Sequence, residues 1–432
     1  MENFIVVKKK SIKSNKEEGL SGLNQEPDFH QQIDNWVYDK VSGNKNDFFS
    51  LVSSLPGIYP MEILLSAERL ASSKKIDSQI FQEILQNSKK ALNPVFFNDE
   101  NSFNPPHPLD FEWRFTRGTV INLTKYCLAL SNIQDIIALL GVPSIYSLVS
   151  NNDLQRKFIL FDKNPIKQPI IVDYCTSIPC NLCDKATNHQ SIAKVVLMDS
   201  PWYPEYYRAF FWNASKICKK TGFVLMVTPK EGTRPNINIE WQDILQFAKK
   251  NGLEYLGICS DNIKYQTPYF ERNALKAADI LNFPRDWRCA NLAIFQKKED
   301  KTTEQPKNLH MSEWYKISYS GIRVRKKIEF KKNFDPRLIS IIPNDILPSV
   351  SRRDPRRNLA DVWTHGNRIF GCKGTNILIL ILYAMSIRKS PFSLIEMVMK
   401  KKLNTNEKEL ILTAQKQIDD LVKTERIEQC LQ

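Results

Sequence analysis

The chain lacks several features that would assign it to a familiar class of protein. No apolar run reaches the roughly 18 residues needed to span a bilayer. The longest candidate, residues 375–387, is shorter and is typical of a buried helix. The first residues contain no secretory apolar core. Nine cysteines, an odd number scattered along the chain, do not suggest a disulfide framework. We therefore expect a cytoplasmic protein without a membrane partner.

Glycine is scarce, with 14 residues in 432, and the sequence contains no phosphate-cradling glycine loop. A Ser-His-Asp arrangement for nucleophilic catalysis is also absent from the sequence. One cluster has spacings that could hold a tetrahedral zinc ion, namely Cys175, Cys180, Cys183 and His189. A second Cys-x-x-Cys pair is missing, so we favour reduced, unrelated thiols and predict no metal site.

The charge that is present is mostly positive. The net charge is +14 and the pI is about 9.2, which favours an acidic partner, most simply nucleic acid. The alternative is that the charge only keeps the protein soluble. Between Lys316 and Lys373, fourteen Lys or Arg residues stand against five Asp or Glu. This segment includes Arg352, Arg353, Arg356 and Arg357, which either bind phosphate oxygens or form salt bridges between domains.

Composition shifts divide the chain into four parts. Residues 1–29 are polar and suggest a flexible arm, and residues 30–100 predict a helical or winged-helix module. After a linker rich in proline and asparagine, residues 105–300 have the pattern of a Rossmann-like domain. Residues 310–432 form a basic C-terminal region, predicted to contain a short hairpin followed mostly by helices.

Seven apolar runs alternate with helical patterns between residues 111 and 298. They end near residues 141, 162, 173, 199, 229, 261 and 298. Continuous apolar strands separated by helices predict an α/β, doubly wound and mostly parallel sheet of seven strands, covered on both faces. In such sheets, ligands bind beyond the carboxyl ends of the strands.

Acidic residues end three of these strands. Asp162 follows the second strand and could accept hydrogen bonds from ribose hydroxyls, while Asp173, after the third, could reach an adenine amino group. Asp199 follows the fourth strand. The alternative is that these acids are solvated or cap the next helices. Three acids on one predicted edge favour a binding site there.

The fourth strand runs directly into Asp199, Ser200, Pro201 and Trp202. The Asp199 carboxylate and the Ser200 carbonyl could accept both protons of an exocyclic amine and stabilise the positive charge that develops on its nitrogen. The Trp202 ring could stack on a flat base, and Tyr203 could extend that platform. The alternative is ordinary aromatic packing at the start of a helix.

This order of strands, with an acid after the second and D-S-P-W after the fourth, resembles the class I S-adenosylmethionine-dependent methyltransferases over about residues 111–298. D-S-P-W is similar to the D-P-P-W-like motif of enzymes that methylate adenine N6 or cytosine N4. The resemblance implies S-adenosylmethionine as the cofactor. The residues implied to hold it are Gly141, Pro143, Ser144, Asp162 and Asp173.

We therefore predict a methyltransferase that modifies an exocyclic amine of DNA or RNA, with adenine N6 favoured. The predicted catalytic residues are Asp199, Ser200, Pro201 and Trp202; the predicted substrate contacts are Tyr203, Lys230, Arg234, Tyr265 and the four arginines of 352–357. Two alternatives stay open. The loop predicted to hold the cofactor contains one glycine, Gly141, and the D-S-P-W motif has Ser200 in place of the first proline of D-P-P-W. Both features also fit a non-catalytic, nucleic-acid-binding subunit of a larger assembly. An aminopropyl-type transferase acting on a small amine would need an acidic pocket.

Overall fold

The computed structural model describes residues 29–43, 45–91, 105–152, 154–164, 174–183, 188–306, 314–317, 319–325 and 333–431. The predicted arm lies outside these ranges, apart from Phe29. The chain forms two compact units. The first comprises residues up to 88, 114–266 and 283–309; the second comprises residues 89–113, 267–282 and 310–432. Among the described residues, no helix is both long and apolar enough to cross a bilayer.

Four helices open the first unit: α1 (Phe29–Ser42), α2 (Phe48–Ser54), α3 (Pro60–Ser72) and α4 (Ser78–Ser88). Their apolar faces share a core that includes Ile33, Phe48 and Ile63. The Asp47 side chain caps α2 by accepting a hydrogen bond from the backbone N–H of Ser50. Within the described residues of this segment, every regular element is a helix. We call α1–α4 the helical module.

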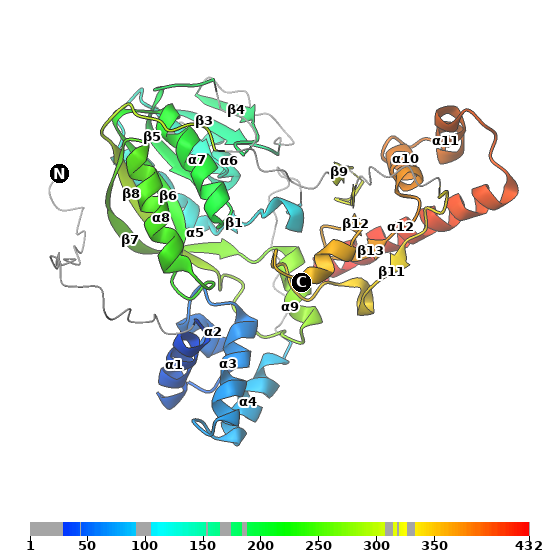
Figure 1. The fold of residues 1–432 in the computed structure, drawn as a ribbon, viewed down its shortest axis with the longest axis horizontal. Coiled ribbons are helices and arrows are strands. Elements are labelled where there is room, and N and C mark those ends of the chain that lie inside the picture. The colour runs from blue at the N-terminus through cyan, green and yellow to red at the C-terminus, as the bar shows by residue number, and fades with distance from the viewer. Residues whose placement is uncertain are drawn as a thin grey trace. The chain divides into compact units, whose positions relative to one another are not determined.

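The sheet of the first unit has the order β1-β7-β8-β6-β5-β2-β3-β4 (Figure 1). Its strands are β1 (Arg114–Phe115), β2 (Ile136–Leu140), β3 (Lys157–Asp162), β4 (Cys175–Pro179), β5 (Ala193–Met198), β6 (Cys218–Pro229), β7 (Leu253–Gln266) and β8 (Cys289–Lys297). Strands β4, β3, β2, β5 and β6 are parallel, and β8 is antiparallel to both of its neighbours. The sheet is therefore mixed rather than wholly parallel, and the two-residue strand β1 pairs antiparallel with β7 at one edge.

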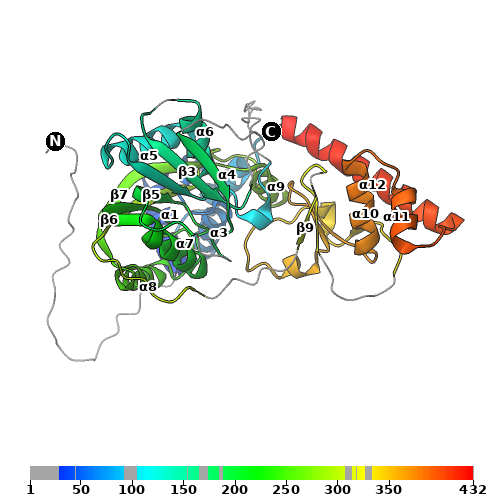
Figure 2. The same ribbon diagram turned by 90° about the horizontal axis from the view of Figure 1, so that it is seen from above.

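Helices cover both faces of the sheet, as its continuous apolar strands require. Helices α5 (Arg117–Ala129) and α6 (Pro143–Ser150) pack together, and α7 (Pro204–Ile217) packs with α8 (Ile237–Lys250). The two pairs lie on opposite sides of the strands (Figure 2). The sheet centre is dry, since Val195, Val196 and Leu197 of β5 have no exposed surface.

The third predicted strand requires a correction. We expected it to end at Asp173, but the strand next to β3 is β4, which begins at Cys175. Asp173 itself lies outside the described residues. The structure therefore places two of the three predicted acids, Asp162 and Asp199, at strand ends and leaves the prediction for Asp173 untested.

The second unit has a five-stranded antiparallel sheet in the order β11-β13-β12-β10-β9. Its strands are β9 (Trp314–Lys316), β10 (Arg323–Arg325), β11 (Ile339–Ser340), β12 (Val362–Trp363) and β13 (Ile369–Gly371). The predicted hairpin is the antiparallel pair β9 and β10. The helices are α9 (Tyr269–Ala277), α10 (Thr375–Ser386), α11 (Pro391–Met399) and α12 (Thr405–Leu431). Residues 267–282, which we had placed inside the Rossmann-like domain, belong to this unit.

Candidate functional site

The candidate site lies where the direction of strand addition reverses. From β2 the chain adds β3 and β4 on one side, then returns to place β5 on the other side of β2. Residues Leu140, Phe161 and Met198 stand side by side in register at the carboxyl ends of these strands. Gly141, Asp162 and Asp199 follow them directly. A reversal of this kind opens a crevice at the strand ends, which is where ligands bind in α/β sheets.

Backbone hydrogen bonds hold these three residues together. The Gly141 N–H donates to the Phe161 carbonyl over 3.0 Å, and the Asp199 N–H donates to the Leu140 carbonyl over 3.1 Å. Gly141 has a φ of +67°, and a Cβ there would lie 3.0 Å from the Asp199 carbonyl oxygen and 3.1 Å from the Phe210 ring. Only glycine fits this turn without strain.

Helix α6 begins just after the Gly141 turn. Pro143 is its first residue and Ser144 its second, so backbone N–H groups at the start of the helix lie next to the crevice. Asp162 is half-buried, and its Oδ1 accepts a hydrogen bond from the Asn164 N–H over 2.7 Å. The structure thus brings together Gly141, Pro143, Ser144 and Asp162 of the predicted cofactor residues.

Asp199 carries the most perturbed carboxyl group of the site. The residue keeps a small exposed surface, but its carboxyl group is enclosed by protein atoms. Burial raises the pKa of Asp199 to about 7, although hydrogen bonds from Tyr265 and Trp202 and the charge of Arg288 oppose the rise. The Tyr265 hydroxyl donates to Asp199 Oδ1 over 2.9 Å. A carboxylate with such a pKa can accept a proton near neutral pH.

Tyr265 has a different position from the one we predicted. It was expected to contact the substrate, yet it is only 2% exposed, and the centre of its ring lies 4.8 Å from that of Phe115. Its polar end faces Asp199 instead. Proximity to Asp199, together with burial, raises the pKa of Tyr265 well above its usual value, so the hydroxyl stays protonated and remains a hydrogen-bond donor.

Trp202 is also more enclosed than a stacking platform would be. It is 6% exposed, and the Arg288 guanidinium lies 4.0 Å from the centre of its ring. The Tyr265 ring meets it edge-on at 5.7 Å. Arg288 was missed at the sequence level, where the only signal was its place just before the last strand. The guanidinium covers one face of the ring that we expected to receive a base.

Two hydroxyl groups near Asp199 have no hydrogen-bond partner within the described part of the chain. They belong to Ser200 and Tyr207, which are 3% and 2% exposed. Buried hydroxyls are normally hydrogen-bonded, because leaving one unpaired costs about 1–3 kcal/mol. Both hydroxyls therefore adjoin the perturbed carboxyl group of Asp199 with hydrogen-bonding capacity that the described protein does not use.

Arg234 was predicted to contact the substrate, but its guanidinium already has protein partners. It forms a two-pronged ion pair with Glu240 of α8, and its Nε donates to the Trp202 carbonyl oxygen over 3.1 Å. The ring of Tyr203, the residue before α7, lies 5.7 Å from the same guanidinium. Arg234 therefore links helix α8 to the turn that follows β5. Lys230 lies in the same loop, four residues earlier.

The predicted arginine cluster belongs to the second unit. Arg352 and Arg353 are exposed, whereas Arg356 pairs with Asp354 through two hydrogen bonds. Arg357 donates to the Val350 carbonyl and lies 4.5 Å above the Trp363 ring. Within this unit, Arg356 and Arg357 stabilise their own loop, and the exposed Arg352 guanidinium lies 5.8 Å from the centre of the Phe111 ring.

No metal centre is apparent among the residues that the structure describes, where no three His, Cys, Asp or Glu side chains gather closely enough to bind an ion. Cys175 and Cys183 are buried, and burial raises the pKa of Cys175 to about 11. A thiol with this pKa stays protonated at neutral pH and is a poor ligand.

Comparisons with known proteins find matches among solved structures. Neither protein-family models nor curated proteins match the sequence. Among solved structures, a branched-chain polyamine synthase mutein from Thermus thermophilus is 11% identical, with a TM-score of 0.49 over 65% of this chain and 91% of that one. A TehB-like SAM-dependent methyltransferase from Corynebacterium glutamicum is 14% identical, with a TM-score of 0.27 over 42% of this chain and 88% of that one. The N-methyltransferase NodS from Bradyrhizobium japonicum is 10% identical, with a TM-score of 0.27 over 42% and 96%.

Proposed function

We propose that the protein is an S-adenosylmethionine-dependent transferase that alkylates an amine nitrogen, with Asp199 accepting the proton that the nitrogen loses. The observation that carries this proposal is the state of Asp199. Its enclosed carboxyl group has a pKa of about 7 and lies at the reversal point of the sheet, next to the Gly141 turn. Proton transfer to a positioned group is most effective when its pKa is close to the working pH.

The residues present fit the cofactor that the fold implies. Gly141 leaves no room for a Cβ, Asp162 places a carboxylate at the end of β3, and the buried hydroxyl of Ser200 lacks a partner in the described protein. The Gly141 turn and the start of α6 would hold the amino-acid part, and Asp162 would hold the ribose hydroxyls. S-adenosylmethionine would supply an electrophilic alkyl group on a positively charged sulfur.

The first acceptor that we propose is the exocyclic amine of a nucleic-acid base. The D-S-P-W sequence, the net charge of +14 and the exposed Arg352 and Arg353 support it. Asp199 and the Ser200 carbonyl would accept the amine protons. Because Arg288 lies against one face of Trp202, a base would have to displace that side chain or approach the edge of the ring.

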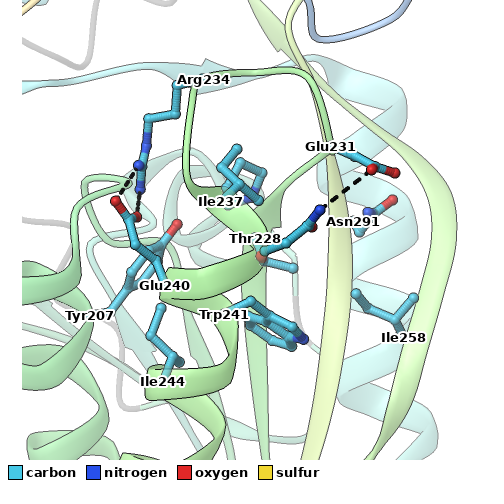
Figure 3. A pocket seen from close by; sticks show the side chains of 12 residues that line it. Tyr207, Thr228, Glu231, Arg234, Ile237, Glu240, Trp241, Ile244, Ile258 and Asn291 are labelled. Carbon is cyan, nitrogen blue, oxygen red and sulfur yellow. Dashed lines mark hydrogen bonds and ion pairs between the residues drawn. The ribbon is translucent and has the colours of Figure 1, made fainter. Parts of the chain in front are cut away.

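A second acceptor class, a small cationic amine, is favoured by a pocket next to the site (Figure 3). The pocket has a volume of about 150 Å³ and lies between α8 and strands β6, β7 and β8. Tyr207 lines it and is within electrostatic reach of Asp199. The lining contains two carboxylates, Glu231 and Glu240, and one guanidinium, Arg234, which pairs with Glu240, so it carries a net negative charge. With the indole of Trp241, this lining suits an ammonium ion rather than a phosphate.

Labelled transfer tests the proposal and separates the two acceptor classes. The full chain is incubated with methyl-labelled S-adenosylmethionine, and separately with an aminopropyl-labelled decarboxylated form, in the presence of DNA, RNA or a small diamine. We expect one donor–acceptor pair to become labelled, with Asp199→Asn reducing the rate at least about 100-fold. Asp243→Asn, the same change at an exposed position of α8, serves as the control. Labelling that is equal in Asp199→Asn and wild type would refute the role of Asp199.

A further inference from the structure

The helical module contacts the two loops that hold Trp202, and neither loop is part of the module. We propose that α1–α4 form the outer support of the catalytic site and that Trp36, Gly57 and Gly232 are positioning residues for it. This inference goes beyond the proposed function, because it concerns how the site is kept in shape whatever group is transferred.

The first of the two loops is residues 230–236, between β6 and α8. Gly232 there has a φ of +83°, and a Cβ on it would lie 2.5 Å from the Trp36 ring of α1 and 3.3 Å from Ile58. Beside this contact, the Gln32 side-chain amide donates to Glu231 over 2.7 Å. The loop therefore passes so close to α1 that its backbone rests directly on an indole ring.

The second loop is residues 283–288, which lead into β8. The Gly57 N–H, in the turn before α3, donates to the Trp287 carbonyl over 3.0 Å. A Cβ at Gly57 would meet the Cys289 carbonyl oxygen at 3.2 Å, so the backbones are in close contact. The rings of Tyr59 and Trp287 pack edge-to-face at 5.6 Å. The same turn of the module thus fixes the backbone on either side of Arg288.

Each loop delivers one arginine to the turn after β5. Arg234 of the first loop donates to the Trp202 carbonyl, and Arg288 of the second lies 4.0 Å above the Trp202 ring. One arginine holds the backbone of Trp202 and the other its side chain. Because Trp202 follows Asp199 by three residues, a change in either loop alters the surroundings of that carboxyl group.

Hydrogen exchange on the full chain tests this support directly and does not depend on activity. Trp36→Ala should leave the buried contacts of Ile33 and Val37 in place, yet release both loops. We expect exchange at least about tenfold faster in residues 230–236 and 283–288, and Trp36→Phe should restore most of the protection. Tyr38→Ala, on the same helix but 42% exposed, is the control. Unchanged exchange rates in both loops of Trp36→Ala, or an equal increase in exchange in Tyr38→Ala, would overturn the proposal.

A second variant covers the case in which Trp36→Ala disrupts the module itself. Gly232→Ala leaves every module residue intact but pushes a methyl group against Trp36. Gly118→Ala, where a Cβ meets nothing within 4 Å, is its control. We expect faster exchange at residues 283–288 only if the module couples the two loops. Protection of residues 283–288 that is identical in Gly232→Ala and Gly118→Ala would show that the loops are held independently.

Measuring the pKa of Asp199 distinguishes positioning from a general loss of stability, because a loss of stability alone would leave this pKa unchanged. The groups that face this carboxyl are Tyr265, Trp202, Arg288 and, at longer range, Tyr207. If the module holds Arg288 in place, Trp36→Ala should raise the pKa of Asp199, because a positive charge that favours the carboxylate moves away. Carbon-13 NMR of labelled aspartate measures this pKa, and an unchanged value in Trp36→Ala would contradict the coupling to Arg288.

Discussion

The two units each enclose a carboxyl group, and the two carboxyl groups differ in how their charge is balanced. Glu425 of α12 is 2% exposed; Thr364 donates to it, His365 Nδ1 lies 3.0 Å away and Arg368 Nη1 lies 3.3 Å away. These partners lower the pKa of Glu425 although burial opposes them. At Asp199, burial outweighs its partners and raises the pKa to about 7.

The difference separates a carboxylate whose charge is balanced by its partners from one that burial holds close to its protonated form. Arg368 also binds Glu428, which accepts a hydrogen bond from Tyr269 of α9, so the Glu425 cluster joins three elements of the second unit. Its charges are satisfied within the unit. Asp199 adjoins two hydroxyl groups without partners in the described protein, those of Ser200 and Tyr207. An incompletely balanced cluster at a strand end is more typical of a ligand-binding site than of a structural ion-pair cluster.

The largest effect on stability is expected at Glu425. Glu425→Gln removes one of the two carboxylates that balance the buried Arg368 guanidinium, so the free energy of unfolding should fall by about 3–5 kcal/mol. The equivalent change at Asp199, Asp199→Asn, should cost less than about 1 kcal/mol, because it removes a charge that burial disfavours. Chemical denaturation followed by circular dichroism measures both. A larger loss of unfolding free energy in Asp199→Asn than in Glu425→Gln would contradict this difference between the two carboxyl groups.

A smaller effect is expected when the hydrogen bond to Asp199 is removed. Tyr265→Phe deletes a donor that favours the carboxylate, so the pKa of Asp199 should rise above about 7. The pH at which transfer reaches half of its maximum should therefore move upward. The rate far above this pH should change less than the rate at pH 7. Tyr255→Phe, on the same strand but 39% exposed, is the control and should leave the profile in place.

The mildest prediction concerns stability as a function of pH. Since the pKa of Asp199 is about 7 in the folded chain and 3.8 ordinarily, the folded state holds this proton over a range where the unfolded state has lost it. The contribution of Asp199 to stability is full below about pH 4 and is lost as the pH rises to 7. Asp199→Asn should flatten this part of the curve. A wild-type curve and an Asp199→Asn curve of equal slope between pH 4 and 7 would contradict the raised pKa.

The sequence predicted the part of the site that depends on consecutive residues. Asp162 and Asp199 end apolar runs, and parallel strands bring their carboxyl ends to one edge, so their meeting beside Gly141 followed from the pattern. The strand that pairs with β3 begins at Cys175 instead of ending at Asp173, because apolarity predicts that a buried strand exists but does not fix its ends. Nor did the D-S-P-W sequence indicate that Arg288 would cover one face of the Trp202 ring.

The partners of Asp199 could not be predicted in the same way. Tyr265 reaches Asp199 across 66 positions of sequence, through strand β7 on the far side of β8 and β6. Arg288 is placed by a loop whose backbone rests on Gly57 of the helical module. Such contacts depend on how separate elements pack, and one sequence without a structure contains no local signal for them.

One calorimetric titration tests the central claim most directly. S-adenosylmethionine is titrated into the wild-type chain and into Asp162→Asn, which keeps the shape of the strand end but removes a charged acceptor for the ribose hydroxyls. We predict one binding site per wild-type chain and affinity at least about tenfold weaker in Asp162→Asn. Absence of binding to the wild-type chain at millimolar S-adenosylmethionine would contradict the account. So would equal affinity in both proteins, since the ligand would then bind away from the edge formed by Gly141, Asp162 and Asp199.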